Sequence, residues 1–262
     1  MDFQKATKNI RGELKAYLQG AGLKSLVIGM SGGIDSTLCA ALAKPVCDEL
    51  GVTLIGRSIP IETNKKDELD RAKLAGECFC HDFKQVSLGG MYSKMEERIH
   101  IFEQKPNSPI AKGNIKARLR MIYLYNVAGM NEGMVLSTDN YTELLLGFST
   151  IMGDWGDYAM IQYLWKTEVY GLAKYLADEM EDDRAKEALR ACIKATPTDG
   201  LGISNSDLEQ IGAGSYEEVD VILMDYVIDG NATFRDHPVV QRYEKTHFKR
   251  NWPIRISRQN II

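Results

Sequence analysis

Short apolar runs alternate with amphipathic stretches along the first half of the chain. Residues 3–20 place Phe3, Ile10 and Leu14 on one helical face, and the GAG that follows predicts the end of this helix. The apolar run KSLVIGM then predicts a buried strand, and the alanine-rich STLCAALAKPVCDEL predicts a helix after a glycine turn. This order predicts a strand, a glycine loop and a helix that follow one another directly.

The same alternation continues to about residue 149. It predicts strands in VTLIGRSIP, DFKQVSL and MVLST, and helices in KKDELDRAKLAGE, MYSKMEERI and residues 114–131. Alternation of this kind predicts an α/β fold, a doubly wound parallel sheet flanked by helices. Beyond residue 149 the strand signal fades, and we expect loops and helices, including KTEVYGLAKYLADEM and SYEEVDVILMDYVIDG. No linker or internal repeat divides the chain, so residues 1–262 are expected to form a single domain.

Composition excludes several classes of partner. The formal charge of −4, with no dense block of Lys and Arg, argues against a nucleic-acid surface, which needs a basic face. No run approaches the roughly 18 apolar residues that cross a bilayer, and the N-terminus lacks the apolar core of a signal peptide. We therefore expect a cytoplasmic protein. The five cysteines, of which Cys78 and Cys80 are the one close pair, match neither a zinc pattern nor a disulfide scaffold.

The loop SGGIDS lies between the first predicted strand and its helix. Glycines there let the backbone approach an anion, and the helix start offers free N–H groups to a phosphate. A tight turn that binds nothing would need only Gly32 and Gly33, whereas Ser31 and Ser36 add hydroxyl donors and Asp35 adds a ligand for a hard cation. Neither the Walker A string nor a GxGxxG fingerprint occurs here, which argues against P-loop hydrolysis and hydride transfer.

SGGIDS resembles the SGGxDS signature of the N-type ATP pyrophosphatases, whose fold is adenine nucleotide alpha hydrolase-like. These enzymes cleave ATP between the α and β phosphates, and the group includes NAD, GMP, asparagine and argininosuccinate synthetases. The resemblance implies that ATP lies against Gly29, Met30, Ser31, Gly32, Gly33, Ile34, Asp35 and Ser36.

A second block, KGNIKARLRM, is similar to the NxxARxRM helix of NAD synthetases. Lys116, Arg118 and Arg120 could present donors to a phosphate, although charge alone favours a solvated basic face over that role. The resemblance implies that Asn114 and Arg118 contact the acceptor substrate.

A third block, STDNYTELLLGFSTIMGDWGD, is similar to the NAD synthetase string GTDHxxExxxGFxTxxGDGGxD and follows a predicted strand end, where ligands of open sheets bind. By that resemblance Thr138 contacts ATP and Glu143 joins Asp35 at Mg²⁺. Asp154 and Asp157 would then line the region for the acceptor and ammonia.

Two later segments add basic and hydroxyl groups. Lys166 in LWKTEV matches the family lysine that reaches the phosphates of ATP, and Thr198 in PTDGL matches the threonine of PTADL. The tail KTHFKRNWPI is similar to TEHKRxxP, which implies that Lys249 and Arg250 are candidates for binding the dinucleotide. The departures from the family strings are Asn140, Trp155, the sequence PTDGL and Phe248, and all are expected on the acceptor side.

Together these blocks resemble ammonia-dependent NAD synthetase from about residue 22 to residue 255. The resemblance implies ATP-dependent amidation of deamido-NAD with ammonia, through an adenylylated carboxylate, with release of AMP and pyrophosphate. Mg²⁺ would be the cofactor, ATP a co-substrate, and Asp154 and Lys166 the catalytic residues. No glutaminase domain is expected, so ammonia would come from solution or from a separate glutaminase.

Family members are dimers, and the helix at 114–131 carries apolar side chains beside its arginines, so we also expect a homodimer. Three alternatives stay open from sequence. They are a related ligase that amidates or adenylylates a different acceptor, a tRNA thiolase, and a nucleotide-binding protein without activity.

Overall fold

Five parallel strands form the centre of the protein. The computed structural model describes residues 1–62, 64–198 and 206–261. The strands are β1 (Ser25–Gly29), β2 (Thr53–Ser58), β3 (Asp82–Gln85), β4 (Gly133–Ser137) and β5 (Tyr158–Ala159). They lie in the order β3-β2-β1-β4-β5, and each neighbouring pair is parallel. Because the strand order reverses next to β1, the carboxyl ends of β1 and β4 border a crevice of the kind that binds ligands in open α/β sheets.

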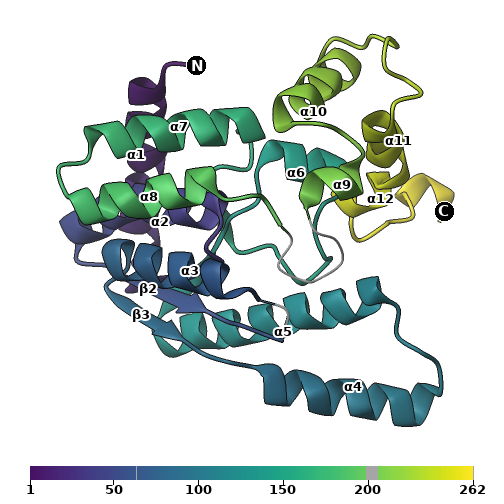
Figure 1. Ribbon diagram of the computed structural model, residues 1–262, viewed down its shortest axis with the longest axis horizontal. Helices are drawn as coiled ribbons and strands as arrows, with labels where there is room; N and C mark the ends of the chain where they lie inside the picture. Colours follow the sequence, from purple (N-terminus) through teal and green to yellow (C-terminus); the bar gives the residue numbers. More distant parts are fainter. Residues whose placement is uncertain (63, 199–205, 262) are drawn as a thin grey trace.

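Helices cover both faces of this sheet (Figure 1). On one face lie α1 (Phe3–Ala21), α2 (Ile34–Leu50), α3 (Lys66–Phe79), α7 (Lys166–Glu179) and α8 (Asp183–Lys194). The other face is covered by α5 (Pro109–Met130), with α4 (Gly89–Glu103) packed against it. The sheet is therefore buried on both sides, as an all-parallel sheet requires.

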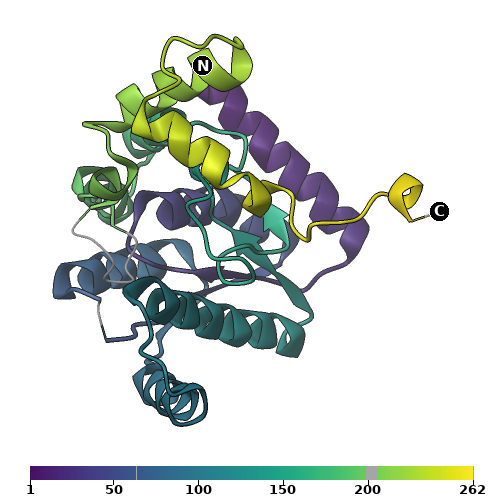
Figure 2. The ribbon, with the colours of Figure 1, turned by 90° about the vertical axis from the view of Figure 1, so that its right-hand side faces the viewer.

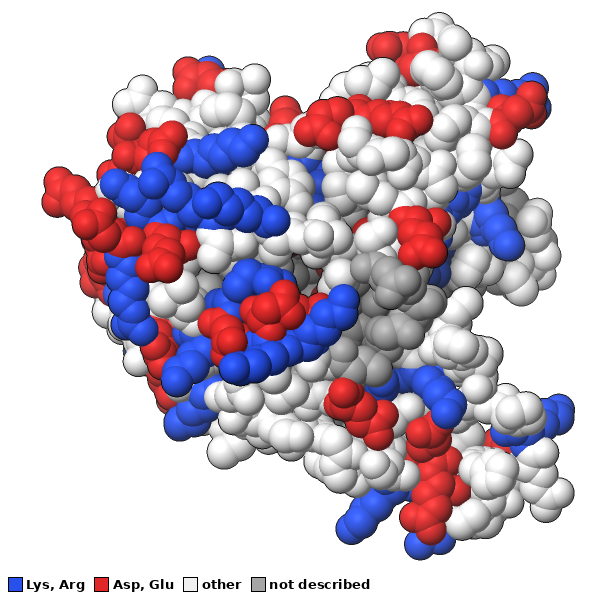
Figure 3. All heavy atoms as spheres, viewed as in Figure 1, with Lys and Arg blue, Asp and Glu red and all other residues white. Residues whose placement is uncertain are grey.

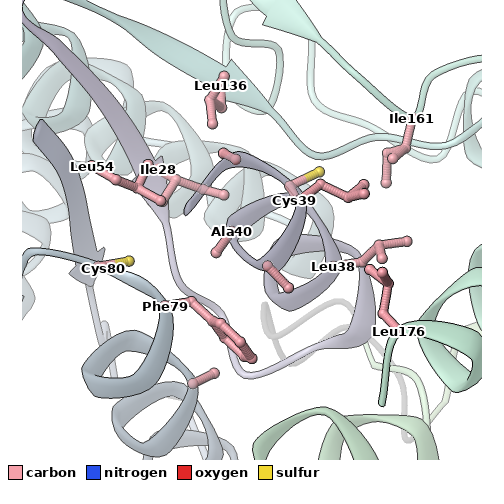
Figure 4. Close-up of a cluster of buried hydrophobic side chains, with 14 of the residues drawn as sticks. Ile28, Leu38, Cys39, Ala40, Leu54, Phe79, Cys80, Leu136, Ile161 and Leu176 are labelled. Carbon is pink, nitrogen blue, oxygen red and sulfur yellow. The ribbon is translucent and has the colours of Figure 1, made fainter. Parts of the chain in front are cut away.

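Side chains of each strand alternate between two cores. Ile28 of β1 packs into the core around α2 (Figure 4), and Leu26 belongs to the same core, whereas Val27 between them packs into the core under α5. Leu136 of β4 points to the α2 side and Val135 to the α5 side. This period of two explains why the strands read as continuous apolar runs in the sequence, since both faces of each strand are covered.

The last part of the chain adds a helical lobe beside the carboxyl ends of the strands. It comprises α6 (Tyr141–Leu146), α9 (Asp207–Ile211), α10 (Tyr216–Leu223), a π-helix (Met224–Ile228), α11 (Pro238–Lys245), α12 (His247–Arg250) and a 3-10 turn (Arg258–Asn260). The helices α6, α9, α10 and α11 and the π-helix share a third apolar cluster that includes Leu146, Ile222 and Val239. Beyond α12 the chain extends away from the body of the molecule (Figure 2).

The predicted fold class is confirmed, and every strand predicted before residue 149 is present. Several elements were not predicted individually, among them β5, α6, α8, α9, α11 and α12. Strand β5 has only two residues, and α8 follows the predicted α7 segment directly. The helix predicted at 114–131 begins earlier, at Pro109, because Ser108 caps its first turn by accepting from the Ala111 N–H.

The surface carries charges of both signs. On the face shown in Figure 3, Lys and Arg are interspersed with Asp and Glu. Among the described parts of the chain, no helix combines the length and the apolar character that crossing a membrane would need.

Candidate active site

The loop between β1 and α2 packs tightly against α3. Gly32 has φ +83°, and a Cβ added there would lie 2.3 Å from the backbone oxygen of Glu68. Arg71 Nε donates to the Gly32 carbonyl at 3.1 Å, and the Gly33 N–H donates to Ser31 Oγ at 3.2 Å. Only glycine satisfies both the left-handed backbone and this close approach. The two glycines thus let the loop pack against α3 and also let a ligand approach its backbone.

A buried lysine lies between two acids at the end of this loop. Lys166 Nζ donates to Asp35 Oδ2 at 2.6 Å and to Glu143 Oε1 at 2.8 Å. Lys166 is the first residue of α7, and its N–H donates to Thr142 Oγ1 at 2.9 Å. One charged side chain from the start of each of three helices, α2, α6 and α7, therefore lies at the same point, although these segments are far apart in the sequence. The lysine side chain is only 3% exposed, so these ion pairs are shielded from water.

Asn140 connects the two acids. Its Nδ2 donates to Asp35 Oδ1 at 2.9 Å, and its Oδ1 accepts from the Glu143 N–H at 3.0 Å. Asn140 is fully buried and caps α6 in a capping box with Glu143. The amide of Asn140 is therefore bound to the lysine-acid cluster, and its expected place on the acceptor side stays a prediction.

Burial shapes the ionisation of this cluster. Burial raises the pKa of Glu143 to about 7, although the nearby Lys166 ammonium opposes the shift. For Lys166, burial alone would lower the pKa, but Asp35 and Glu143 outweigh it, and the pKa lies well above its usual value. The raised pKa of Glu143 and the raised pKa of Lys166 are consistent with each other, because two carboxylates share one ammonium. Lys166 is therefore charged, and Glu143 takes up a proton at a higher pH than an ordinary glutamate does.

A cavity of about 260 Å³ opens beside these groups. Of the residues predicted to bind ATP, the metal or the acceptor, those that line it are Gly29, Met30, Ser31, Gly32, Gly33, Ile34, Asp35, Thr138, Glu143, Asp154, Lys166 and Thr198. Ser36 lies behind the loop, 2% exposed, with its Oγ 3.1 Å from Ser31 Oγ. Of PTDGL, residues 199–201 lie outside the described residues.

The other predicted acceptor residues gather around one turn, residues 147–154. Thr150 Oγ1 donates to Asn114 Oδ1 at 2.8 Å, and Arg118 Nε donates to the Ile151 carbonyl at 3.3 Å. Lys249 Nζ donates to the carbonyls of Gly147 and Ser149. None of the three lines the cavity among the residues that the structure describes.

Two aspartates of the acceptor region have different surroundings. Asp154 lines the cavity, accepts from the Thr150 N–H, and has a pKa raised above its usual value by burial. Asp157 Oδ2 instead accepts from the Val135 N–H at 2.9 Å, while its own N–H donates to the Val135 carbonyl at 2.7 Å. Asp157 thus pairs with strand β4 next to the short strand β5.

Several cavity residues were not singled out as ATP or acceptor ligands from the sequence. They are Arg57, Asn64, Glu68, Arg71, Tyr170 and Asp207, whereas Arg120, a candidate phosphate donor from the sequence, also lines the cavity. Arg57 lies near the carboxyl end of β2, a position where ligand groups are expected in open sheets. Arg71 and Asp207 reach the cavity only through the packing of α3 and α9, and no local pattern marks them.

The two carboxylates fit a hard cation. Asp35 and Glu143 already share one positive charge, that of Lys166, so both can approach a single ion. No group of three or more His, Cys, Asp or Glu side chains arranged for a metal ion occurs in the described ranges. A divalent cation here would need further oxygen ligands, such as the phosphates of a nucleotide.

The parallel sheet, the glycine loop at the end of β1 and the buried acid-lysine-acid cluster define a nucleotide-binding α/β protein. A profile of the NAD synthase family matches residues 6–253. An NH₃-dependent NAD⁺ synthetase of Thermoplasma acidophilum is 32% identical over 98% of this chain and 99% of its own length. The chain belongs to the NAD synthase family, and it is a ligase that forms a carbon–nitrogen bond.

Solved structures agree on the fold. The NMN synthetase of Francisella tularensis superimposes with a TM-score of 0.81 at 24% identity, covering 98% of this chain and 99% of that one. An NH₃-dependent NAD synthetase from Campylobacter jejuni gives a TM-score of 0.69 at 24% identity, over 98% and 100% of the two chains. At this identity the two structures support the architecture alone.

Proposed function

We propose that the protein converts deamido-NAD to NAD with ATP and ammonia. The observation that carries this proposal is the Asp35-Lys166-Glu143 cluster beside the glycine loop, in one cavity with Thr138 and Asp154. The near full-length likeness to NH₃-dependent NAD⁺ synthetases supports deamido-NAD as the acceptor.

In the first step an oxygen of the nicotinate carboxylate attacks the α-phosphorus of ATP, and the bond to the β-phosphate oxygen breaks. Pyrophosphate leaves with the electron pair of that bond. Loop N–H groups and the Lys166 ammonium stabilise the negative charge that develops on the leaving group. Mg²⁺ held by Asp35 and Glu143 would neutralise phosphate charge when bound.

In the second step ammonia attacks the carbonyl carbon of the acyl adenylate, and AMP leaves. The attacking nitrogen gains a positive charge and must lose a proton. Asp154 lines the cavity and its burial raises its pKa, so it is the group that we propose orients ammonia or takes that proton. Thr138 would contact ATP and Thr198 the pyrophosphate, and no covalent enzyme intermediate is needed.

The acceptor contacts expected at Asn114 and Arg118 stay predictions, whereas those expected at Asp157 and Lys249 compete with the contacts that their side chains make to β4 and to the turn at 147–154. The single synthetase domain over residues 1–262 and the cytoplasmic location also stay predictions. Ammonia would be taken from solution or from a separate glutaminase.

We also propose a homodimer, with α5 at its interface. The apolar side chains of this helix that suggested an interface are those of Ile115, Leu119, Ile122, Tyr123 and Val127. Leu119 is buried in the protein's own core, and Ile115, Tyr123 and Val127 pack against that core. Ile122 is 63% exposed, so it is the member of that set that leaves apolar surface for a partner. Met91 and Phe102 on α4, which packs against α5, are also exposed.

One assay tests the proposed reaction. The purified protein is incubated with ATP, Mg²⁺, ammonium and deamido-NAD, and the products are separated by chromatography. We expect NAD, AMP and pyrophosphate in equal amounts. The control acceptor is the mononucleotide half of deamido-NAD, which carries the same carboxylate. Faster amidation of this half would show that the acceptor is different, and coupling to ADP and phosphate would refute the mechanism.

A further inference from the structure

The end of α6 exposes a set of backbone carbonyls that the helix itself does not satisfy. Gly147 has φ +56°, its N–H donates to the Leu144 carbonyl at 3.1 Å, and the Phe148 N–H donates to the Glu143 carbonyl at 2.9 Å. These bonds form a Schellman motif. The next three carbonyls, those of Leu145, Leu146 and Gly147, lie beyond the reach of the motif and need other donors.

Three cations from the C-terminal helices supply these donors, one for each carbonyl. Arg250 Nη1 donates to Leu145, Arg242 Nε donates to Leu146 at 3.1 Å, and Lys249 Nζ donates to Gly147 at 2.8 Å. Lys249 also donates to the Ser149 carbonyl at 2.5 Å. Consecutive carbonyls are thus fixed by side chains about a hundred residues later in the sequence.

Packing holds these cations in place. The Arg250 guanidinium lies 4.0 Å from the ring centre of Tyr243, and the Arg242 guanidinium lies 4.9 Å from that of Phe148. A Cβ added to Gly147 would lie 2.5 Å from Thr246 Cβ, so the C-terminal helices contact this segment directly. Cations stacked on aromatic rings lose little further freedom when they bind a carbonyl.

The fixed segment joins two groups of the active site. Glu143 lies on α6 just before it, and Asp154 lies at the end of the turn that follows. A shift of the carbonyls from Leu145 to Ser149 would therefore move both carboxylates relative to Asp35 and Lys166. Errors of about 1 Å in such positions can lower a rate a hundredfold.

We propose that Arg242, Lys249 and Arg250 form a C-terminal clamp that positions Glu143 and Asp154 for the reaction. The roles of these two acids rest on the proposed function, whereas the clamp itself rests on the carbonyl contacts.

The clamp assigns Lys249 a positioning role in place of direct contact with a substrate phosphate. An ammonium has three donors, and two of those of Lys249 are committed to Gly147 and Ser149. A phosphate could gain more than one bond only by breaking these contacts.

Lys249→Met tests the clamp, because it removes the ammonium and keeps much of the aliphatic stem. Lys249→Arg is the conservative variant, and Lys245→Met, at an exposed lysine of α11, is the matched control. Hydrogen exchange of the segment 144–154 is measured by mass spectrometry together with kcat, the KM for deamido-NAD and the half-activating Mg²⁺ concentration. We expect exchange of this segment in Lys249→Met to be faster by roughly fivefold or more, because local opening becomes easier.

In the same variant we expect kcat to fall roughly tenfold and the half-activating Mg²⁺ concentration to rise, while the KM for deamido-NAD changes less than about twofold. Lys249→Arg should recover most of the rate, and Lys245→Met should match the wild type. If Lys249→Met does not fold, Arg250→Met serves as the second variant and should show the same pattern.

Unchanged exchange of the segment would overturn the clamp. A KM for deamido-NAD raised roughly tenfold with kcat preserved would also overturn it, since that result assigns Lys249 to direct substrate contact. The exchange measurement needs no turnover. If the wild type makes no NAD, the proposed function fails, and the exchange data still decide whether the clamp exists.

Discussion

The two sides of the active site are built differently. On the ATP side, the loop after β1 and the side chains of Asp35, Glu143 and Lys166 face one cavity directly. On the acceptor side, Asn114, Arg118 and Lys249 bind the turn at 147–154 instead. The proposed ATP side thus faces the cavity, whereas the residues expected on the acceptor side largely support a turn. The difference indicates that sequence strings from one family can mark residues that line a cavity and residues that hold a nearby turn in place.

The largest effect is expected from the two acids of the ATP side. Asp35→Asn and Glu143→Gln should each lower kcat/KM roughly a hundredfold to a thousandfold, because each removes an anionic ligand worth several kcal/mol of charge stabilisation. Steady-state rates over a range of Mg²⁺ concentrations measure this. Asp183→Asn, at a side chain 99% exposed, is the control. Near-normal activity at low Mg²⁺ would show that these acids do not hold the metal.

Removing the shared cation should affect stability as well as rate. Lys166→Met leaves two acids in a buried site without their counter-charge and should destabilise the fold by about 3 kcal/mol at neutral pH. Denaturant unfolding with and without Mg²⁺ measures it, and added Mg²⁺ should restore part of the loss. Lys174→Met, exposed on the same helix, should be neutral. A variant as stable as the wild type would mean that the cluster is already neutralised by protonation.

The features predicted from the sequence are those with local sequence signals, whereas the features that were not predicted depend on contacts between distant segments. The apolar runs of β1, β2 and β4 and the loop SGGIDS are local signals, and each is confirmed in the structure. Strand β5 has two residues and exists because Asp157 pairs with Val135, which no periodicity reveals. Arg71 reaches the cavity because α3 packs on Gly32. Contacts of this kind depend on tertiary packing, so a single sequence does not specify them.

A smaller effect is expected from the proposed dimer surface. Ile122→Asp places a charge on the exposed face of α5, so it should dissociate the dimer at micromolar concentration and raise the KM for deamido-NAD roughly tenfold. The KM for ATP should not change. Light scattering and steady-state kinetics test both statements, with Val221→Asp, 58% exposed on α10, as the control. A wild-type protein that is monomeric and fully active would show that the acceptor site does not depend on a dimer interface.

The smallest effect is expected at Asp157. Asp157→Ala leaves the Val135 N–H without its carboxylate acceptor and should cost about 1 kcal/mol of stability. The KM for deamido-NAD should change less than about twofold, because the carboxylate pairs with β4. Thermal unfolding and initial rates decide this, beside Asp178→Ala on the surface of α7. The opposite result, a large rise in the KM for deamido-NAD with unchanged stability, would show that Asp157 contacts the substrate.

Asn140 stands where the related string has a histidine, and its amide bonds directly to Asp35. A histidine with an unperturbed pKa of about 6.5 would gain or lose a proton in the range where cells work, and its hold on the acid would vary with acidity. An amide has no such transition. In this protein Asn140 itself therefore does not titrate, and a change of acidity acts on its contacts only through the acids that it binds.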